Sequence, residues 1–461
     1  MTGEDENYDR NRSSIITGRE WDYEHRWWYK PAHICRRWRN LILGSASFLG
    51  LYLVCTLGTP VADMLAHSLP IPLVIDYRAY NITAKDEEGI FLALEQSNRI
   101  RSIRLKLSFL NLQKFAMAIK GKLPILEYLV MASSLELTTL VFPKTIQAPH
   151  LRHLILDGVA PPIGSLLLTT AMGLVTLRLV MYDSSNYLNP KSLLQWISPL
   201  SQLETLEVTE TILVDRDVEM LTPTTIHTTL PNLRWLSLKG VSAYLEVLIR
   251  QIATPHLEKL HILFYDDPMP PIPCFVWVMN TTENTQLRFD SAKFEFSHSQ
   301  VLMESFPYDE LYFYPDSVCY PCYLSISADC LRLNGHISSM AQIVDALGHV
   351  ISVVEHLILD HEEYNWPPGE GFEVEIDRRD LYKLLRPFSN VKNLCVNHRV
   401  VEEFSRYIQP DDGDLPPELL PELQELTYFA GSFKVDTAFT SFIDARQNTG
   451  HPVSLVRRSP T

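Results

Sequence analysis

A short pattern of aliphatic residues, most of them leucine, returns along most of the chain. Each copy has aliphatic residues at its first, fourth and sixth positions. The strong copies begin at Ile100, Leu126, Leu151, Leu174, Leu203, Leu233 and Leu257. Weaker copies begin at Val354, Val391 and Leu423, and the stretch from 265 to 350 is irregular. The strong copies start roughly 23 to 30 residues apart, so this spacing predicts a repeat architecture.

The spacing within one copy has a simple structural meaning. Residues two apart on a strand point to the same side, so Leu154 and Leu156 would both enter a core. One unit alone cannot bury its apolar side, whereas stacked units gain ~1.5 to 3 kcal/mol per buried large aliphatic residue. Pattern and period are typical of a leucine-rich repeat. The predicted fold is an α/β solenoid over residues 71–461, with a curved parallel sheet on the concave face and helices on the convex face.

Prolines reinforce this prediction. A proline stands two residues before the first leucine of five copies, at Pro124, Pro149, Pro231, Pro255 and Pro421. Because proline disfavours helix at the preceding residue, we expect each of them to end a helix in register. The spacing of Leu245, Leu248, Ile249 and Ile252 predicts one such amphipathic helix. The alternative, an all-α bundle, gives no reason for proline at this fixed position.

The net charge and the cysteine content indicate which partners and which cellular compartment to expect. The formal net charge is -15, and no basic run offsets it, so we expect no nucleic-acid partner. The 7 cysteines are odd in number and scattered, unlike the disulfide framework of a small secreted domain. A reducing compartment, the cytoplasm or nucleus, is therefore expected.

The amino-terminal region raises the question of a membrane. Residues 1–30 are expected to form a polar tail or a divergent helix, without a secretory signal. The uncharged stretch Leu41 to Ala62 is long enough to cross a bilayer, but Gly44, Gly50 and Pro60 weaken it as a helix. We expect no membrane span. If the stretch did cross, the sequons at Asn81 and Asn280 could be glycosylated.

Residues 31–70 contain a segment that is similar to part of a known domain. The segment Ile34-Cys35-Arg36-Arg37-Trp38-Arg39-Asn40-Leu41 resembles the valine-cysteine-x-x-tryptophan segment that closes an F-box, and the layout is similar to fungal F-box proteins that carry leucine-rich repeats. The resemblance implies that the segment is helical and docks a Skp-type adaptor, linked to a cullin scaffold in a ubiquitin ligase. It implies these adaptor-facing or F-box core positions: Ile34, Cys35, Trp38 and Leu41.

The opening motif of an F-box, a leucine-proline followed by an acidic residue, is missing upstream of Cys35. An aromatic and charged segment, Trp21 to Tyr29, stands in its place. Two functions therefore stay open alongside a less favoured membrane-anchored repeat protein. The leading hypothesis is a substrate receptor whose repeats bind an unknown protein target. The alternative is a leucine-rich-repeat scaffold without a functional F-box.

No constellation of catalytic residues emerges, so we expect a non-enzymatic protein without cofactor or metal. Cys319 and Cys322 have the spacing of a redox pair or of half a zinc site, with Cys330 and His336 close behind, but no second pair follows. Buried structural thiols are the preferred interpretation. His361-Glu362-Glu363 lacks the second histidine of a zinc-protease helix, because Asn365 occupies that position.

Target binding is predicted on the concave face. In each leucine-x-leucine strand the leucines point inward, so the residues between and beside them point outward. The outward residues most suited to binding a target are His153, Asp157, Arg178, Glu207, Trp235, Lys239, Lys259 and His261. Trp235 and Arg178 are of the types most often found as binding hot spots.

Overall fold

A computed structural model gives the three-dimensional structure of the chain. It describes residues 34–44, 51–68, 70–133, 140–162, 164–182, 188–210, 227–265, 289–297, 300–307, 323–329, 333–361, 378–397, 400, 404–405, 419–429 and 439–458. The chain forms two compact units. Unit 1 comprises Met1–Ile212 and Thr228–Leu233, and unit 2 comprises Leu213–His227 and Arg234–Thr461.

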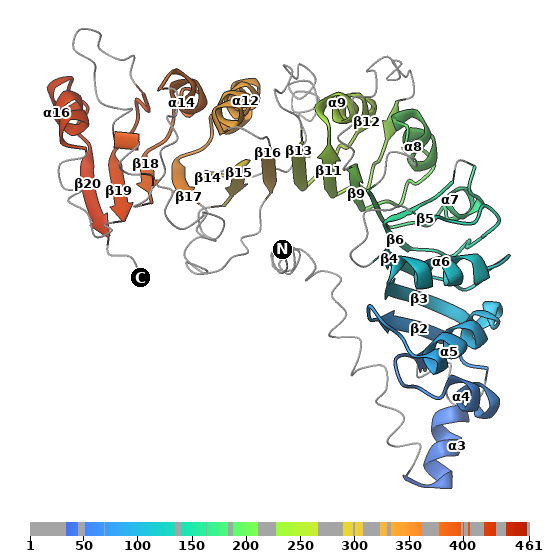
Figure 1. Ribbon diagram of the computed structural model, residues 1–461. Helices are drawn as coiled ribbons and strands as arrows, with labels where there is room; N and C mark the ends of the chain where they lie inside the picture. Colours follow the sequence, from blue (N-terminus) through green and yellow to red (C-terminus); the bar gives the residue numbers. More distant parts are fainter. Residues whose placement is uncertain are drawn as a thin grey trace. The chain divides into compact units, whose positions relative to one another are not determined.

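The sheet of unit 1 is parallel, and its strand order is β1-β2-β3-β4-β6-β8-β9 (Figure 1). Its strands are β1 (Leu53–Cys55), β2 (Leu73–Arg78), β3 (Ile100–Leu107), β4 (Tyr128–Ser133), β6 (His153–Asp157), β8 (Thr176–Met181) and β9 (Thr205–Glu210). Short strands are β5 (Leu140–Val141), which pairs with β7 (Val159–Ala160), and β10 (Thr228–Thr229). Parallel neighbours require a return segment between them, which explains the length of each predicted repeat.

Helices lie along one face of the unit 1 sheet (Figure 1). The unit contains α3 (Arg36–Gly44), α4 (Val61–His67), α5 (Ala84–Leu94), η2 (Ser97–Arg99), α6 (Phe109–Ala118), α7 (Leu166–Thr170) and α8 (Pro190–Ile197). Helix α5 packs on β1 and β2, and α6 packs on β3 and β4. Each of these helices except α3 lies between two strands in sequence, so unit 1 from β1 onward is built mainly from strand-and-helix steps.

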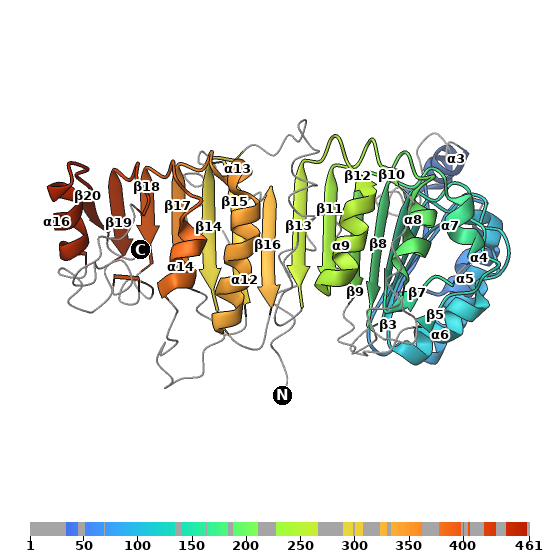
Figure 2. The same cartoon turned by 90° about the horizontal axis from the view of Figure 1, so that it is seen from above.

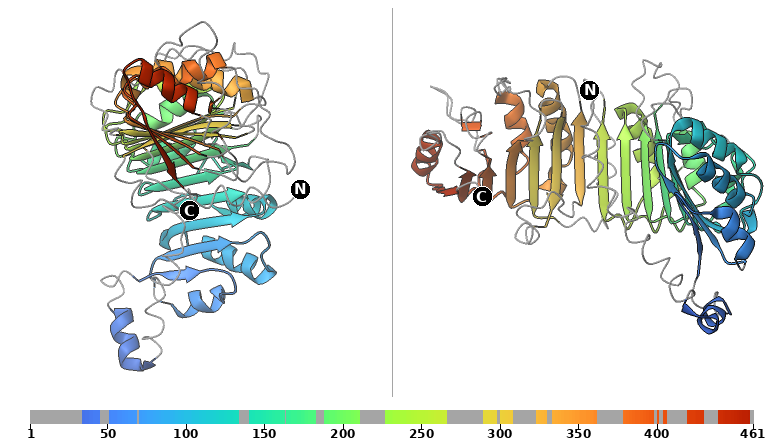
Figure 3. Two further views of the ribbon diagram at one scale, coloured as in Figure 1. Left: turned by 90° about the vertical axis from the view of Figure 1, so that its left-hand side faces the viewer. Right: turned by 60° about the horizontal axis from the view of Figure 1, so that its bottom comes forward.

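Unit 2 has a mostly parallel sheet in the order β11-β13-β16-β15-β14-β17-β18-β19-β20, and Figure 3 shows its strands side by side. They are β11 (Trp235–Gly240), β13 (Lys259–Phe264), β14 (Ser291–Phe296), β15 (Gln300–Phe306), β16 (Leu324–Asp329), β17 (His356–His361), β18 (Asn393–Val396), β19 (Glu425–Phe429) and β20 (Ser454–Arg458). Strand β15 is antiparallel to both β14 and β16. The stretch with an irregular sequence pattern therefore includes a hairpin inserted into a parallel sheet.

The return segments of unit 2 include longer helices. They contain α9 (Ser242–Gln251), the short strand β12 (Ile252–Ala253), α12 (Leu333–Ala346), α13 (Gly348–Ile351), α14 (Arg378–Leu385) and α16 (Thr440–Asn448). Helix α9 packs on β11, and α12 packs on β15 and β16. Figure 2 shows α12 and α14 side by side across the strands, where they contact each other. Helix α9 matches the amphipathic helix predicted from Leu245, Leu248, Ile249 and Ile252, except at its end. The first three residues are buried within α9, whereas Ile252 lies just after it, in β12.

Repeated leucines form the core between strands and helices. Leu154, Leu156, Leu177 and Leu179 are all 0% exposed, as is the first leucine of their copies, Leu151 and Leu174. This confirms the predicted inward direction of the leucines. The α/β architecture with a largely parallel sheet is thus established in each unit.

The prediction that the prolines end helices is wrong. Helix α6 ends at Ala118, well before Pro124, and α9 ends at Gln251, before β12 and Pro255. Each proline instead occupies the second position of a hydrogen-bonded turn. The closing bonds run from the N–H of Leu126, Leu151, Leu233, Leu257 and Leu423 to the carbonyls of Leu123, Ala148, Leu230, Thr254 and Leu420, at 3.0 to 3.3 Å. Proline suits this position because its fixed φ matches the turn and its missing N–H is not needed.

The sheet begins earlier than residue 71, the predicted start of the array. Strand β1 pairs with β2, with Leu53 opposite Leu73 and Cys55 opposite Ile75. A polar link holds the loop after β1 against α5, because the N–H of Gly58 donates to Asp86 at 2.8 Å. Asp86 also forms a capping box with Thr83 at the start of α5. Residues 53–67, predicted as part of the F-box-like segment, therefore pack as the first step of unit 1.

The uncharged stretch from Leu41 to Ala62 is divided by the fold. It contains the end of α3, the strand β1 and the first residues of α4, while 45–50 lie outside the described residues. Within the part of the chain that the structure describes, no helix combines the length and the apolar character needed to span a membrane.

Candidate functional site: the front face of the sheet

Along the six longer strands of unit 1, from β2 to β9, side chains alternate between the core and a second face, which we call the front face. Its members are Asp76 and Arg78 on β2; Ser102, Arg104 and Lys106 on β3; Tyr128, Val130 and Ala132 on β4; His153, Ile155 and Asp157 on β6; Thr176, Arg178 and Val180 on β8; and Thr205, Glu207 and Thr209 on β9. The same alternation defines a front face in unit 2. Because neighbouring parallel strands lie about 4.8 Å apart, rows of these side chains contact one another across the strands.

All predicted target-binding residues of unit 1 lie on its front face. His153, Asp157, Arg178 and Glu207 are partly exposed, which agrees with the predicted outward direction. Register separates them into rows: Arg178 lies opposite Glu207, whereas His153 lies opposite Thr176. They therefore do not form one cluster, and each is surrounded by residues from neighbouring strands.

In unit 2, Trp235, Lys239 and Lys259 are also partly exposed on the front face, and Trp235 lies directly opposite Lys259. His261 differs, because it is only 7% exposed. Its Nδ1 lies 2.9 Å from Oγ of Ser325 on the next strand. The prediction of His261 as an accessible binding residue is wrong. Its side chain is buried and contacts Ser325, which lies 64 residues away in sequence.

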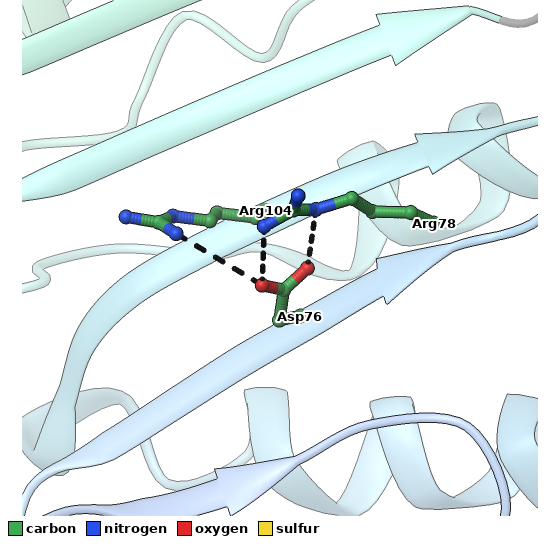
Figure 4. A network of polar contacts seen from close by, with 3 residues as sticks. All are labelled: Asp76, Arg78 and Arg104. Atoms are coloured by element: carbon green, nitrogen blue, oxygen red, sulfur yellow. Dashed lines mark hydrogen bonds and ion pairs between the residues drawn. The ribbon is translucent and has the colours of Figure 1, made fainter. Parts of the chain in front are cut away.

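A carboxylate shared by two arginines lies at the centre of β2 and β3 (Figure 4). Arg78 donates twice to Asp76, from Nε at 2.9 Å and from Nη2 at 2.7 Å. Arg104 approaches the same carboxylate, with Nη1 at 3.9 Å from Oδ2. Asp76 and Arg104 are each 8% exposed. A largely buried charged group requires such compensation, so this network fixes the relative position of the two strands' polar side chains.

Aromatic rings on β4 and β6 lie beside this network, in the neighbouring row of side chains. The guanidinium carbon of Arg104 lies 5.6 Å from the ring centroid of Tyr128, within the range of a cation–π contact. The ring of Tyr128 stacks on His153, with centroids 4.4 Å apart and planes 9° from parallel. Burial, and then the charge of Arg152, lower the pKa of His153. The faces of the two rings are turned toward each other, and the rings form a stacked pair on the front face.

Arg178, one of the two predicted hot spots, is part of an ion pair within the sheet. Its Nε lies 3.5 Å from Oε2 of Glu207. Charge reversal at Arg178 would therefore place two carboxylates directly opposite each other. We expect Arg178→Glu to lower the melting temperature clearly more than Arg178→Gln, because like charges at directly opposed positions destabilise a sheet.

The difference between the two variants tests the contact between Arg178 and Glu207. Thermal unfolding at low and high salt checks it, since added salt should screen the repulsion and reduce the difference between the variants. Equal melting temperatures for Arg178→Glu and Arg178→Gln at low salt would contradict the contact.

The front face of unit 2 is organised around a lysine. Nζ of Lys293 lies 2.7 Å from Glu295 and 2.8 Å from Asp360. Asn397 also donates to Asp360, at 2.6 Å. Burial by itself would lower the pKa of Lys293, but the attraction of Glu295 and Asp360 outweighs it and raises the pKa. This lysine is therefore held as a structural cation.

Helix α3 and the two residues just before it contain the predicted adaptor-binding residues: Trp38 and Leu41 lie in the helix, and Ile34 and Cys35 precede it. Ile34, Trp38 and Leu41 are 70%, 52% and 57% exposed, and the thiol of Cys35 is exposed too. Their spacing places Ile34, Trp38 and Leu41 on one side of the helical turn, while Ile42 is buried. The four residues lie together and are accessible.

Sequence reasoning missed the site residues of β2 to β4, namely Asp76, Arg78, Arg104 and Tyr128. Strand β2 reads Leu-Val-Ile-Asp-Tyr-Arg, in which Leu73, Ile75 and Tyr77 are buried. It lacks the leucine-x-x-leucine opening, so the repeat pattern does not include it. A search for simple alternation of apolar and charged residues would have identified it.

Several predicted features lie outside the described residues: Trp21 to Tyr29, Asn280, Cys319, Cys322, Cys330, Glu362, Glu363 and Asn365. The side chains of His336 and His361 also lie outside them. No group of three or more His, Cys, Asp or Glu residues that could hold a metal ion occurs within the described ranges.

The sequence was compared with known proteins. It matches no protein-family model, and no curated protein is similar to it.

Proposed function

We propose that this protein is a leucine-rich-repeat binding protein that serves as a substrate receptor of a Skp-cullin-F-box type ubiquitin ligase, without an enzymatic activity of its own. Helix α3 docks the Skp-type adaptor, and the front face of the sheet binds the protein target. The repeat assignment is supported by a structural unit that recurs along the chain. Each unit contains buried leucines, one parallel strand and a segment that returns to the next strand. The same backbone bond also recurs between steps, for instance from Val175 N–H to Arg152 C=O and from Glu204 N–H to Val175 C=O, both at 2.8 Å.

The observation that carries the adaptor assignment is the exposed apolar side of α3. Large apolar side chains elsewhere in the strands and helices are mostly buried, whereas Ile34, Trp38 and Leu41 share one exposed side. Exposed aromatic and aliphatic residues grouped in this way are typical of a protein interface. Their positions are those that the F-box resemblance assigns to the adaptor-facing segment.

The adaptor assignment predicts the behaviour of Trp38→Ala. Loss of a central tryptophan from an interface costs about 2 kcal/mol or more, which is roughly a thirtyfold loss of affinity. We expect co-purification with a Skp-type adaptor to be abolished while the melting temperature stays unchanged, because Trp38 is more than half exposed. Leu110→Ala is a matched control, since Leu110 is also an exposed apolar residue on a helix of unit 1. It should bind the adaptor normally.

Failure of the unmodified protein to bind any Skp-type adaptor at micromolar concentration would refute the adaptor role. It would favour the second candidate, a leucine-rich-repeat scaffold without a functional F-box. One structural observation supports this alternative: β1 and α4 belong to the first step of the sheet, so α3 is the one described helix of the F-box-like segment outside the strand-and-helix steps. Target binding by the front face is common to both candidates.

A further inference from the structure

Helix α3 has an apolar and a basic exposed side, and its sequence places the two next to each other. Residues three and four positions apart are neighbours on the surface of a helix. Leu41 is therefore a neighbour of both Trp38 and Arg37, and Asn40 is a neighbour of both Arg37 and Arg36. The apolar side of α3 thus continues without a gap into a second side, which we call the basic side, made of Arg36, Arg37 and Asn40.

The basic side is open to solvent and lies away from the rest of the chain. All three of its residues are exposed. Ile42, four positions after Trp38, is only 4% exposed, so it marks the side of α3 that packs against its own unit. The basic side lies beyond Leu41, on the opposite side from Ile42. A partner that covers Trp38 and Leu41 must therefore come close to the two arginines.

The two arginines have no counter-charge in the part of the chain that the structure describes. Neither forms an ion pair with a described residue, and α3 contains no acidic residue. A hollow on the surface of α3 is lined by Arg36, Arg37, Asn40 and Leu41. Guanidinium groups and a side-chain amide donate hydrogen bonds, and arginine pairs most strongly with carboxylates. The hollow therefore suits a carboxylate that lies beside an apolar group.

We propose that α3 binds an acidic partner surface, in which an apolar depression receives Trp38 and Leu41 and neighbouring carboxylates pair with Arg36 and Arg37. This inference rests on the proposed adaptor role of α3 and states the chemistry of the adaptor surface that α3 contacts. The protein as a whole has a net charge of -15 and repels an acidic partner, so the arginines also direct the partner toward α3.

An anionic membrane is the other ligand that tryptophan and arginine on one helix can suit. Membrane binding strengthens with the apolar area that enters the bilayer. Among its described side chains, the 9-residue helix α3 exposes only two large apolar ones, Trp38 and Leu41, while Ile42 is covered by protein. A protein surface can enclose two side chains, so it fits α3 better than a bilayer does.

The test measures binding of a purified Skp-type adaptor to the full chain by isothermal titration calorimetry, at low and high salt. We expect Arg36→Glu/Arg37→Glu to weaken binding at least about tenfold at low salt, because two attractive contacts become repulsive. Added salt should weaken binding by the unmodified protein but not by the double variant. The melting temperature should stay unchanged, because both arginines are exposed.

A matched control separates local contacts from net charge. Lys85→Glu/Lys191→Glu makes the same charge change at two exposed lysines of unit 1 that lie on α5 and α8. It should bind the adaptor as the unmodified protein does. An equal loss in both double variants would overturn the proposal. So would binding by Arg36→Glu/Arg37→Glu that keeps the affinity and salt dependence of the unmodified protein.

The remaining outcomes separate this inference from the adaptor role. Loss of binding in Trp38→Ala together with normal binding in Arg36→Glu/Arg37→Glu would refute this inference alone. No adaptor binding by the unmodified protein would refute the adaptor role and, with it, the partner named here. Binding to vesicles of phosphatidylserine and phosphatidylcholine that is lost in Arg36→Glu/Arg37→Glu would assign the basic side to a membrane and overturn the proposal.

Discussion

Asp76→Ala is expected to lower the free energy of unfolding of the protein by about 2 to 4 kcal/mol. The substitution removes the carboxylate that Arg78 and Arg104 share. Arg78 can turn toward solvent, but Arg104 is only 8% exposed and would keep a positive charge in a poorly hydrated position. Urea unfolding followed by circular dichroism measures the change.

A second substitution tests the cause. Arg104→Met in the Asp76→Ala background removes the buried charge that has lost Asp76 while keeping an apolar side chain over Tyr128, so it should restore part of the lost stability. Glu87→Ala is the control, because it breaks the exposed ion pair with Lys114 and should cost at most about 0.5 kcal/mol. A loss no larger than this control in Asp76→Ala would show that the network contributes little to stability.

Glu210→Gln is expected to change the pH dependence of stability. Glu210 ends β9 and is 1% exposed, and neither carboxylate oxygen has a well-aligned hydrogen-bond partner. Burial raises the pKa of Glu210 from 4.5 to about 8, an effect that the backbone at Leu188 offsets only in part. The folded protein therefore holds a proton on this group at neutral pH.

The way in which the free energy of unfolding changes with pH follows from proton binding at Glu210. Between pH 4.5 and about 8 the folded state binds a proton at Glu210 that the unfolded state has released, so this group makes stability fall as pH rises. Glutamine resembles the protonated carboxyl and removes that dependence. We expect Glu210→Gln to match the unmodified protein near pH 4.5 and to exceed its free energy of unfolding by roughly 3 kcal/mol near pH 7.5.

Urea unfolding at a series of pH values measures this difference. Glu204→Gln, at an exposed glutamate just before the same strand, should reproduce the pH profile of the unmodified protein. A constant difference between Glu210→Gln and the unmodified protein from pH 4.5 to 8 would contradict a protonated Glu210.

Sequence alone determined the features that depend on local periodicity. Alternation along Leu154, Ile155 and Leu156 predicts which side chains enter the core, because residues two apart on a strand share a face whatever the neighbouring strand is. Helix α9 followed equally from the spacing of Leu245, Leu248 and Ile249. The α/β class therefore needed no knowledge of contacts between distant residues.

Prediction from the local sequence was less reliable where the same residue type is common in two different local structures. Proline at a fixed distance before each leucine was interpreted as the end of a helix, but in the fold it opens a turn. Both positions accept the fixed φ and the missing N–H of proline, so the residue alone cannot distinguish them. The closing bond to a carbonyl three residues earlier distinguishes them.

Only the tertiary structure decided which polar side chains meet. Asp76 and Arg104 are opposite each other because β2 and β3 pair in one particular register, and His261 is buried because β16, far along the chain, lies beside β13. The β14–β15 hairpin similarly separates β16 from β17 in the sheet. Strand register and strand order depend on the packing of return segments of unequal length, and the periodicity of one strand contains no information about its neighbour.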